Sequence, residues 1–317
     1  MEIGVQTWGT DAVALRRYWA LADELGYARI TYGDGLGAWT FDGWTALGAL
    51  AILTRRARLG PAVTYAFDRA AHHPSWLAKR AVTLDHLSGG RAELRLGVGA
   101  EDQDTARGWT EHGITYPPAS LRVAMVEEAI AIVRDLWAGK RVVRHGPHWP
   151  LAGAMIAPLP LQEPGLPVWV AAMGRHALAA AARSADGWEA SYVTPSAFAE
   201  RWALVRRGLA VAGRPEAGFR RSVELDVVLA GPARLDAALD GFCRVRDIAR
   251  DHPLLATMLC GDAAAVAARL ADYEAAGVTD VMLGFADFPG TGMLEALARD
   301  VVPLLRAREP RSSPRAR

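Results

Sequence analysis

The sequence predicts a parallel α/β protein, a (β/α)8 TIM barrel, on three observations. Short β-branched and aliphatic runs alternate with amphipathic or alanine-rich stretches along the 317 residues. Loops containing glycine separate the two kinds of segment. Neither a composition break nor a linker divides the chain, so we expect a single domain over residues 1–305. A doubly wound open sheet has the same alternation and is the rival fold.

The expected strands are short apolar runs that end in a turn. The run at 91–98 shows why, since Leu94 and Leu96 face one side of an extended chain while Glu93 and Arg95 face the other. In chain order, the strands are expected at 3–7, 28–32, 57–64, 91–98, 167–172, 186–192, 221–230 and 278–285.

Helices are expected between these strands. Asp11 is a typical N-cap for the first helix, and Gly26 is a typical residue after its last turn. The stretch 119–138 is the longest, and its apolar residues form one stripe at helical spacing. The helices are expected at 11–25, 43–54, 75–87, 119–138, 176–184, 195–212, 263–276 and 290–308.

Three connections are longer than a tight turn requires. They are 34–41 after the second strand, 100–118 after the fourth strand and 139–166 before the fifth. Long connections in a TIM barrel tend to build the substrate site. The C-terminal segment 306–317 contains five arginines and one glutamate, and we expect it to be a solvated, disordered tail.

Composition excludes several classes of protein. Hydrophobic residues make up 51% of the chain and charged residues 22%, as in an ordinary globular protein, and the formal net charge of +1 gives no global attraction to nucleic acid. No apolar stretch reaches the ~18 residues of a membrane span. Two cysteines and no signal-peptide pattern favour the cytoplasm. His145 and His148 lack a third ligand nearby, so we expect no metal site.

A resemblance to a known family rests on the sequence LDHLSGGR at 84–91, which continues into LRLGVG at 94–99. The chain resembles the luciferase-like flavin-dependent oxidoreductases, which comprise bacterial luciferase-like monooxygenases and coenzyme F420-dependent relatives. The resemblance extends over residues 1–305. Further matching segments, in the family's order, lie at 42–50, 58–64, 73–79, 167–172, 185–188 and 273–280.

The resemblance implies a barrel that binds its flavin at the carboxyl ends of the strands. The turn before the helix at 176–184 would bind a phosphate with backbone N–H groups, and Arg175 would add a charge-assisted bond, unless it is only a surface arginine. A non-prolyl cis peptide is implied at Ala62–Val63. The implied cofactor-binding positions are Trp39, Ala62, Val63, Thr64, Gly99, Ala100, Ala172, Met173, Gly174 and Arg175.

The resemblance also implies catalytic positions. Asp34 matches an aspartate that deazaflavin-using relatives follow with a catalytic histidine, but Gly35 occupies the next position here. That departure puts sugar-phosphate dehydrogenase chemistry in doubt. Asp102 falls where a relative has a proton-donating carboxylate, although a loop cap explains it equally well. From the residues alone, His72 either lines a site or simply precedes a helix.

Three functional hypotheses follow. The first is a two-component monooxygenase that uses reduced FMN from a separate flavin reductase, and O2, on a small organic substrate. The second is a coenzyme F420-dependent oxidoreductase that transfers hydride. The third is a non-catalytic flavin-binding protein. Four tryptophans, Trp8, Trp109, Trp149 and Trp188, are candidates for an apolar pocket wall. A homodimer is expected by analogy with the family.

Overall fold

A computed structural model of the chain describes residues 1–69 and 71–307. Eight parallel strands follow one another side by side in the order β3-β2-β1-β11-β9-β8-β7-β4. Bridges between Leu59 and Ala92 and between Thr64 and Leu96 join the two ends of this order and close the barrel. The strands are β1 (Glu2–Thr7), β2 (Arg29–Tyr32), β3 (Arg58–Pro61), β4 (Leu94–Gly97), β7 (Val168–Ala171), β8 (Gly187–Ser191), β9 (Arg220–Leu229) and β11 (Asp280–Phe285).

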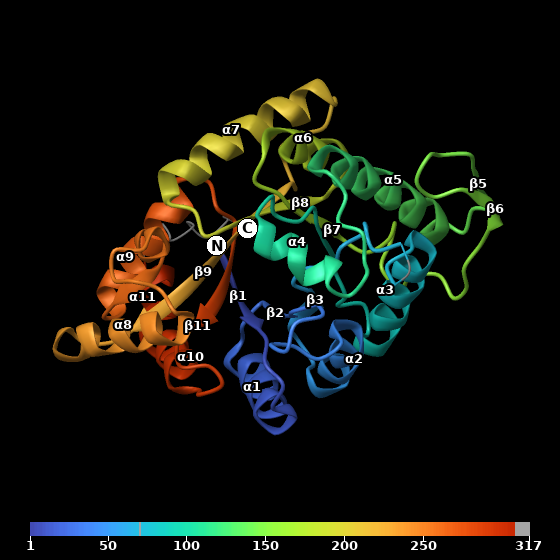
Figure 1. The fold of residues 1–317 in the computed structure, drawn as a ribbon. Helices are drawn as coiled ribbons and strands as arrows, with labels where there is room; N and C mark the ends of the chain where they lie inside the picture. The colour runs from blue at the N-terminus through green and yellow to red at the C-terminus, as the bar shows by residue number, and fades with distance from the viewer. Residues whose placement is uncertain (70, 308–317) are drawn as a thin grey trace, which may run out of the picture.

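The predicted TIM barrel is therefore confirmed, and helices surround it (Figure 1). All eight expected strands are present. Seven expected helices are also present, with Asp11 accepting hydrogen bonds from the N–H groups of Val13 and Ala14 at the start of the first. These helices are α1 (Ala12–Leu25), α2 (Gly43–Leu53), α3 (Pro74–Ser88), α5 (Ala119–Trp137), α6 (Arg175–Ser184), α7 (Pro195–Val211) and α9 (Ala263–Ala275).

The expected helix at 290–308 is not continuous. It consists of α10 (Gly292–Ala296), a π-helical turn η2 (Leu297–Val301) and α11 (Val302–Arg306). Pro303 has no N–H to donate, so the regular α-helical bonding cannot run through this segment. Arg306 ends α11, and residues 308–317 of the expected tail lie outside the described residues.

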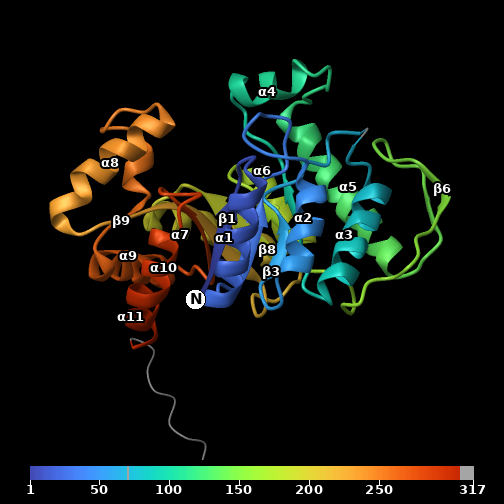
Figure 2. The same ribbon diagram turned by 90° about the horizontal axis from the view of Figure 1, so that it is seen from below.

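Several short elements within the connections were not predicted. α4 (Gln103–Thr110) lies in the connection after β4, and the antiparallel hairpin of β5 (Val142–Arg144) and β6 (Leu151–Ala154) lies before β7. The hairpin is at the outer edge of the molecule, far from the barrel axis (Figures 1 and 2). Between β9 and α9 lie α8 (Pro232–Arg246), the turn η1 (Pro253–Ala256) and β10 (Leu259–Gly261), which extends the sheet beside β9.

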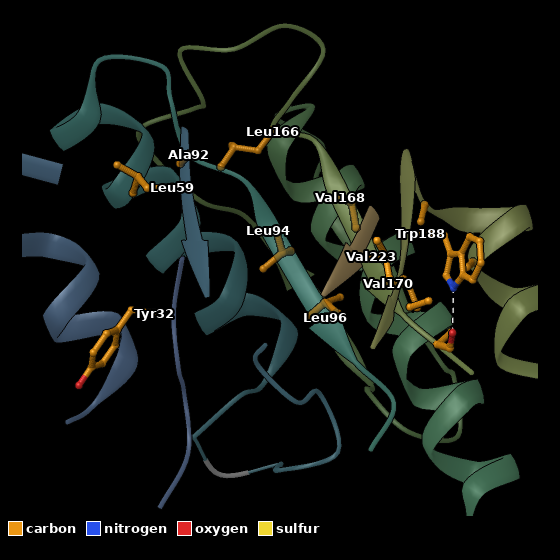
Figure 3. Close-up of a cluster of buried hydrophobic side chains, with 14 of the residues drawn as sticks. Tyr32, Leu59, Ala92, Leu94, Leu96, Leu166, Val168, Val170, Trp188 and Val223 are labelled. Carbon is orange, nitrogen blue, oxygen red and sulfur yellow. Dashed lines mark hydrogen bonds between the residues drawn. The ribbon is translucent and has the colours of Figure 1, made fainter. Parts of the chain in front are cut away.

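The hydrophobic core lies between the strands and the helices. Every second residue of each strand points outward and is aliphatic or aromatic, as Leu94, Val168 and Val223 illustrate in Figure 3. Trp188 belongs to this layer, where its indole N–H donates to the carbonyl of Ala172 at 2.8 Å. In the described part of the chain no helix is both long and apolar enough to span a membrane.

The inside of the barrel is charged at its amino end. Arg29 of β2 binds Glu93 at 3.1 Å and also contacts Asp280 of β11. Arg95 of β4 binds Glu93 at 3.2 Å and contacts Glu189 of β8, and all five side chains are at least nine-tenths buried. Burial alone would raise the pKa of Glu93, but the surrounding arginines lower it. These ion pairs therefore connect β2, β4, β8 and β11 across the barrel.

A buried charge whose partner is removed is strongly destabilising. We therefore expect Arg95→Met to lower the free energy of unfolding by about 3–5 kcal/mol, because the buried carboxylate of Glu189 loses the guanidinium that it contacts. Urea denaturation measures the change. Arg107→Met is the matched control, since it breaks an exposed pair with Asp104 on α4 and should cost less than about 1 kcal/mol. Equal losses in the two variants would contradict the prediction.

Candidate active site

The candidate site lies at the carboxyl ends of the barrel strands. Figure 2 shows α4 at this end of the molecule, opposite the N-terminus. The opposite, amino end has a cavity of about 480 Å³, lined among others by Arg58, Trp169 and Arg220. Since the residues matched to the family's functional positions follow the carboxyl ends of the strands, the site is built there and not at the amino-end cavity.

Small residues form the upper part of the inner wall. At the inward-facing positions above the charged network, the strands or the residues that follow them carry Gly33, Gly97, Ala171, Ser191 and Gly284. The absent side chains leave room for aromatic rings from the loops. A Cβ at position 33 would lie 2.4 Å from the Trp39 ring, and one at position 97 would lie 2.8 Å from the Tyr65 ring.

Asp34 and His72 come together at this end. Asp34 follows β2, and His72 precedes α3, yet the imidazole Nε2 lies 3.4 Å from Asp34 Oδ2. The other ring nitrogen, Nδ1, is 3.1 Å from the carbonyl oxygen of Tyr65. A carbonyl only accepts, so Nδ1 carries the proton and Nε2 faces the carboxylate. Both side chains are more than nine-tenths buried.

This contact answers a question that the sequence left open. The residue after Asp34 is Gly35, so the histidine expected beside this aspartate is absent from its own loop. The loop before α3 supplies His72 instead. Of the two interpretations of His72, the structure therefore favours a residue that lines the site, while His73 takes the capping role by accepting from the N–H of Ser75.

Asp34 is poised as an ionised acceptor. Burial would raise its pKa, but the contact with His72, the hydroxyl of Thr64 and the N–H of Gly43 together lower it below the usual value. Among the described residues, Oδ2 of Asp34 has no partner at hydrogen-bond geometry. A buried carboxylate oxygen without a hydrogen bond is costly, so this atom is a natural acceptor for a bound hydroxyl group.

Asp102 has a different role from the one the resemblance implies. Its carboxylate accepts from the N–H and the hydroxyl of Thr105, at 2.7 and 2.8 Å, and it is the N-cap of α4. These bonds lower the pKa of Asp102, and the side chain is exposed. An exposed carboxylate that stays ionised is a poor proton donor, so the capping interpretation explains this position.

Three of the positions predicted to bind the cofactor, Ala62, Val63 and Thr64, directly follow β3. The peptide bond between Ala62 and Val63 is cis, which confirms the prediction of a cis bond there. The Val63 side chain lies over Gly97, where a Cβ would approach it to 2.4 Å. Thr64 is buried, and its hydroxyl is 3.5 Å from the indole nitrogen of Trp44.

Gly99 and Ala100 are held in place by Arg122 of α5. The guanidinium donates to the carbonyls of Val98 at 2.7 Å, Gly99 at 3.2 Å and Ala100 at 3.0 Å. The hydroxyl of Tyr116 also donates to Ala100. Arg122 therefore shapes the loop after β4. Sequence reasoning missed it, because an arginine in the first turn of a helix has no distinctive pattern.

The predicted phosphate-binding turn is at the amino end of α6. Ala172 is buried, whereas Met173, Gly174 and Arg175 are exposed. Gly174 is the N-cap and has no side chain that could cap the helix, so the first N–H groups of α6 are not capped by a side chain. With the positive end of the helix dipole, they form a suitable anion site, but its use remains a prediction.

The tryptophans divide between core and site. Trp149 and Trp188 are buried at 1% and 0% exposure, and Trp188 lies in the core outside the barrel, so it does not wall the site. Trp109 packs edge-on against Tyr65, with ring centroids 5.4 Å apart. Trp8 lies at the carboxyl end near Gly284, where a Cβ would lie 3.1 Å from its ring.

Comparison with known proteins gives the family. The family model described as luciferase-like monooxygenase matches residues 4–246, which is more than half of the chain. The chain belongs to this family. The expectation of a luciferase-like flavin-dependent oxidoreductase is thus confirmed at the level of the family.

Individual members of the luciferase-like family show how the chain relates to them. It is 36% identical over 204 residues to a phthiodiolone/phenolphthiodiolone dimycocerosates ketoreductase of Mycobacterium sp. (strain JLS), covering 62% of this chain and 50% of that protein. It is 32% identical over 202 residues to an F420-dependent glucose-6-phosphate dehydrogenase of Microbacterium testaceum (strain StLB037), covering 61% and 57%. The chain therefore spans about half the length of the curated relatives it matches.

Solved structures of this family share the fold. An F420-dependent secondary alcohol dehydrogenase, in complex with an F420–acetone adduct, superposes with a TM-score of 0.84 at 18% identity, over 96% of this chain and 99% of that one. A monooxygenase from Streptomyces bottropensis gives a TM-score of 0.77 at 22% identity, over 96% and 99%. At these identities the likeness concerns the fold alone.

The lowered pKa of Asp34 makes a testable contribution to stability. A carboxylate with a depressed folded-state pKa stabilises the fold above its unfolded pKa and loses that contribution as pH falls through the folded value. Asp34→Asn should therefore cost about 1–3 kcal/mol at pH 7, the range for a hydrogen bond to a charged group. Urea unfolding at a series of pH values should show this difference shrinking below about pH 4, near the unfolded pKa of an aspartate. A difference that is constant with pH would contradict the assignment.

Proposed function

We propose that the chain is a coenzyme F420-dependent oxidoreductase that interconverts an alcohol and a carbonyl group on a small organic substrate. The observation that carries the proposal is the buried contact between His72 and Asp34, 3.4 Å apart, at the carboxyl ends of the strands. Alcohol–carbonyl interconversion needs a group that takes or gives a proton at the substrate oxygen. The named relatives, a ketoreductase and an F420-dependent dehydrogenase, support the same chemistry.

The residues present fit a deazaflavin cofactor. The small residues of the upper barrel wall are covered by the rings of Trp39 and Tyr65, which offer flat apolar surfaces, and Asp34 Oδ2 is a buried acceptor without a hydrogen bond among the described residues. The exposed turn Met173–Gly174–Arg175 offers N–H groups to a phosphate. Ala62, Val63, Thr64, Gly99 and Ala100 would face the ring, and Trp39 would flank it. When bound, the cofactor supplies hydride transfer.

The proton moves through the residue pair. In the direction of alcohol oxidation, the substrate hydroxyl would donate its hydrogen bond to Nε2 of His72, which takes the proton, while Asp34 Oδ2 lies 3.4 Å from the same nitrogen. The Tyr65 carbonyl keeps the proton on Nδ1 and so orients Nε2. The ionised Asp34 then stabilises the imidazolium that results. In the reverse direction Nε2 returns the proton to the carbonyl oxygen as it is reduced.

A two-component monooxygenase that uses reduced FMN is the second candidate, supported by the family to which the chain belongs. It would depend on O2 and on a separate flavin reductase. A non-catalytic flavin-binding protein is the third candidate, and any specific turnover would eliminate it. The small-molecule substrate and the homodimer belong to the proposal in each catalytic case.

Parallel binding titrations decide between the cofactors. We expect the purified protein to bind coenzyme F420, followed by tryptophan quenching, and to bind oxidised and reduced FMN at least about tenfold more weakly. Arg175→Ala should weaken F420 binding by about 1–3 kcal/mol if this side chain binds the phosphate. Arg207→Ala, on the exposed face of α7, is the control. Selective binding of reduced FMN would overturn the deazaflavin proposal in favour of the monooxygenase.

Substitution of His72 should affect the catalytic step and not the binding of the cofactor. We expect His72→Asn to reduce kcat by about 10²- to 10⁴-fold, the range for general acid–base catalysis, while the Kd for F420 changes little. His145→Asn changes an exposed histidine next to the outer hairpin and should leave kcat unchanged. Steady-state kinetics under identical conditions compares the three proteins. Wild-type kcat in His72→Asn would remove His72 from the mechanism.

A further inference from the structure

A second acidic side chain, Glu224, points into the same end of the barrel. On β9, Ser222 faces the barrel interior, because its hydroxyl donates to Glu189 Oε2 at 2.8 Å. Alternate residues of a strand share a face, so Glu224 and Asp226 also face inward, one and two steps nearer the carboxyl end. Glu224 pairs in register with Ser191 on one neighbouring strand and with Met282 on the other.

Glu224 is not fully enclosed by its neighbours on the sheet. The in-register residue on β8 is Ser191, whose side chain is small, and the one on β11 is Met282. The Glu224 side chain is only half-buried, so part of it remains open at this end of the barrel.

Tyr192 fixes the position of Glu224. Its hydroxyl donates to Glu224 Oε1 at 2.8 Å, and its backbone N–H donates to the Glu224 carbonyl at 3.0 Å. Tyr192 has a φ of 51°, a left-handed conformation that is uncommon for a residue with a bulky side chain. Local features of this kind concentrate at functional sites. One bond from Tyr192 therefore reaches the carboxyl group of Glu224, and a second holds the backbone of the same residue.

The charges around Glu224 favour its neutral form. Burial, the charge of Glu189 and the charge of Asp226 raise the pKa of Glu224 to about 7, against the hydrogen bonds from Tyr192 and Ser191. Arg246 of α8 donates to both oxygens of the neighbouring Asp226, at 2.7 and 2.8 Å.

Tyr65 connects the two acidic groups of the site. Its pKa is raised to about 12 by burial and by the charges of Tyr116, Glu224 and Asp34. Glu224 and Asp34 therefore both lie within electrostatic reach of the Tyr65 hydroxyl, on different strands of the barrel. The His72–Asp34 contact forms one wall of the site and the Tyr192–Glu224 contact forms another.

We propose that Glu224 is a substrate-binding residue that donates a hydrogen bond from its neutral carboxyl to an uncharged oxygen of the substrate. The wall formed by Tyr192 and Glu224 then selects substrates that have no carboxylate or phosphate next to it. The inference rests on the proposed function. Arg246, on this wall, already donates to both oxygens of Asp226. An anionic substrate group would therefore meet the like charge of Asp226, whereas a hydroxyl or carbonyl would meet a hydrogen-bond donor on Glu224.

The test compares wild type with Glu224→Gln, with Glu200→Gln on the exposed face of α7 as the charge-matched control. The substrates are pairs of secondary alcohols that differ by one carboxylate, such as butan-2-ol and 3-hydroxybutyrate, assayed with F420. We expect wild type to prefer the uncharged members by at least about tenfold in kcat/KM, with KM rising above about pH 7 as Glu224 ionises. In Glu224→Gln, KM should depend less on pH, and the kcat/KM preference for the uncharged alcohols should be smaller. Glu200→Gln should change neither the pH dependence of KM nor this preference.

Two results would overturn the inference even if the proposed function is correct. One is a failure of the expected preference: the F420-bound enzyme turns over the carboxylated alcohols at least as well as the uncharged ones, or it turns over neither set. The other is the same pH dependence of KM in wild type and in Glu224→Gln.

A measurement without cofactor separates this inference from the proposed function. A carboxyl with a raised folded-state pKa stabilises the fold below its unfolded pKa, near 4.5, and loses that contribution as pH rises to about 7. The midpoint of urea unfolding should therefore fall over this range in wild type and in Glu200→Gln, but less in Glu224→Gln. If F420 fails to bind, the proposed function falls. In that case identical pH dependence of unfolding in the three proteins would overturn the role of Glu224 as well.

Discussion

The rest of the structure depends on ion pairs inside the barrel, which are made by the guanidinium groups of Arg29 and Arg95. They bind three buried carboxylates, those of Glu93, Glu189 and Asp280, and the indole of Trp169 lies 5.3 Å from one guanidinium and 4.6 Å from the other. Such charges are stable away from water only when every partner is in place. The network therefore sets the relative positions of strands that are far apart in the sequence.

The two ends of the barrel interior have different tasks. The amino end is filled by long, paired charged side chains, which make it rigid. The carboxyl end has glycine, alanine and serine at the corresponding positions, so that rings and carboxyl groups from the loops occupy the space instead. Asp34 and Glu224 can keep different protonation states there because one lies against an imidazole and the other against further carboxylates.

Sequence patterns predicted the fold well because the alternation of the strands is visible locally. The alternation at 93–96 already indicates a strand with two different faces. Leu94 and Leu96 lie on the apolar face toward the helices, and Glu93 and Arg95 lie on the charged face inside the barrel. The hairpin at 142–154 and α8 were missed, since their position is set by contacts with other elements and not by a local pattern.

The site was predictable only in part. The cis bond after Ala62 and the turn before Arg175 follow from local motifs, but the approach of His72 to Asp34 depends on two loops that meet in space. Glu224 was missed for a related reason, because a glutamate in a strand does not reveal which residues neighbour it across the sheet.

The strand that closes the barrel has a consequence for where this protein can be divided. The match to the family model ends at residue 246, yet β11, at Asp280–Phe285, pairs with both β1 and β9 and contributes Asp280 to the charged network. A fragment that ended with the match would expose two sheet edges and leave Arg29 without one of its counter-ions. The unit that is recognisable by sequence similarity is thus shorter than the unit that can fold, and domain boundaries for expression or fusion are better drawn from the strand order than from the match.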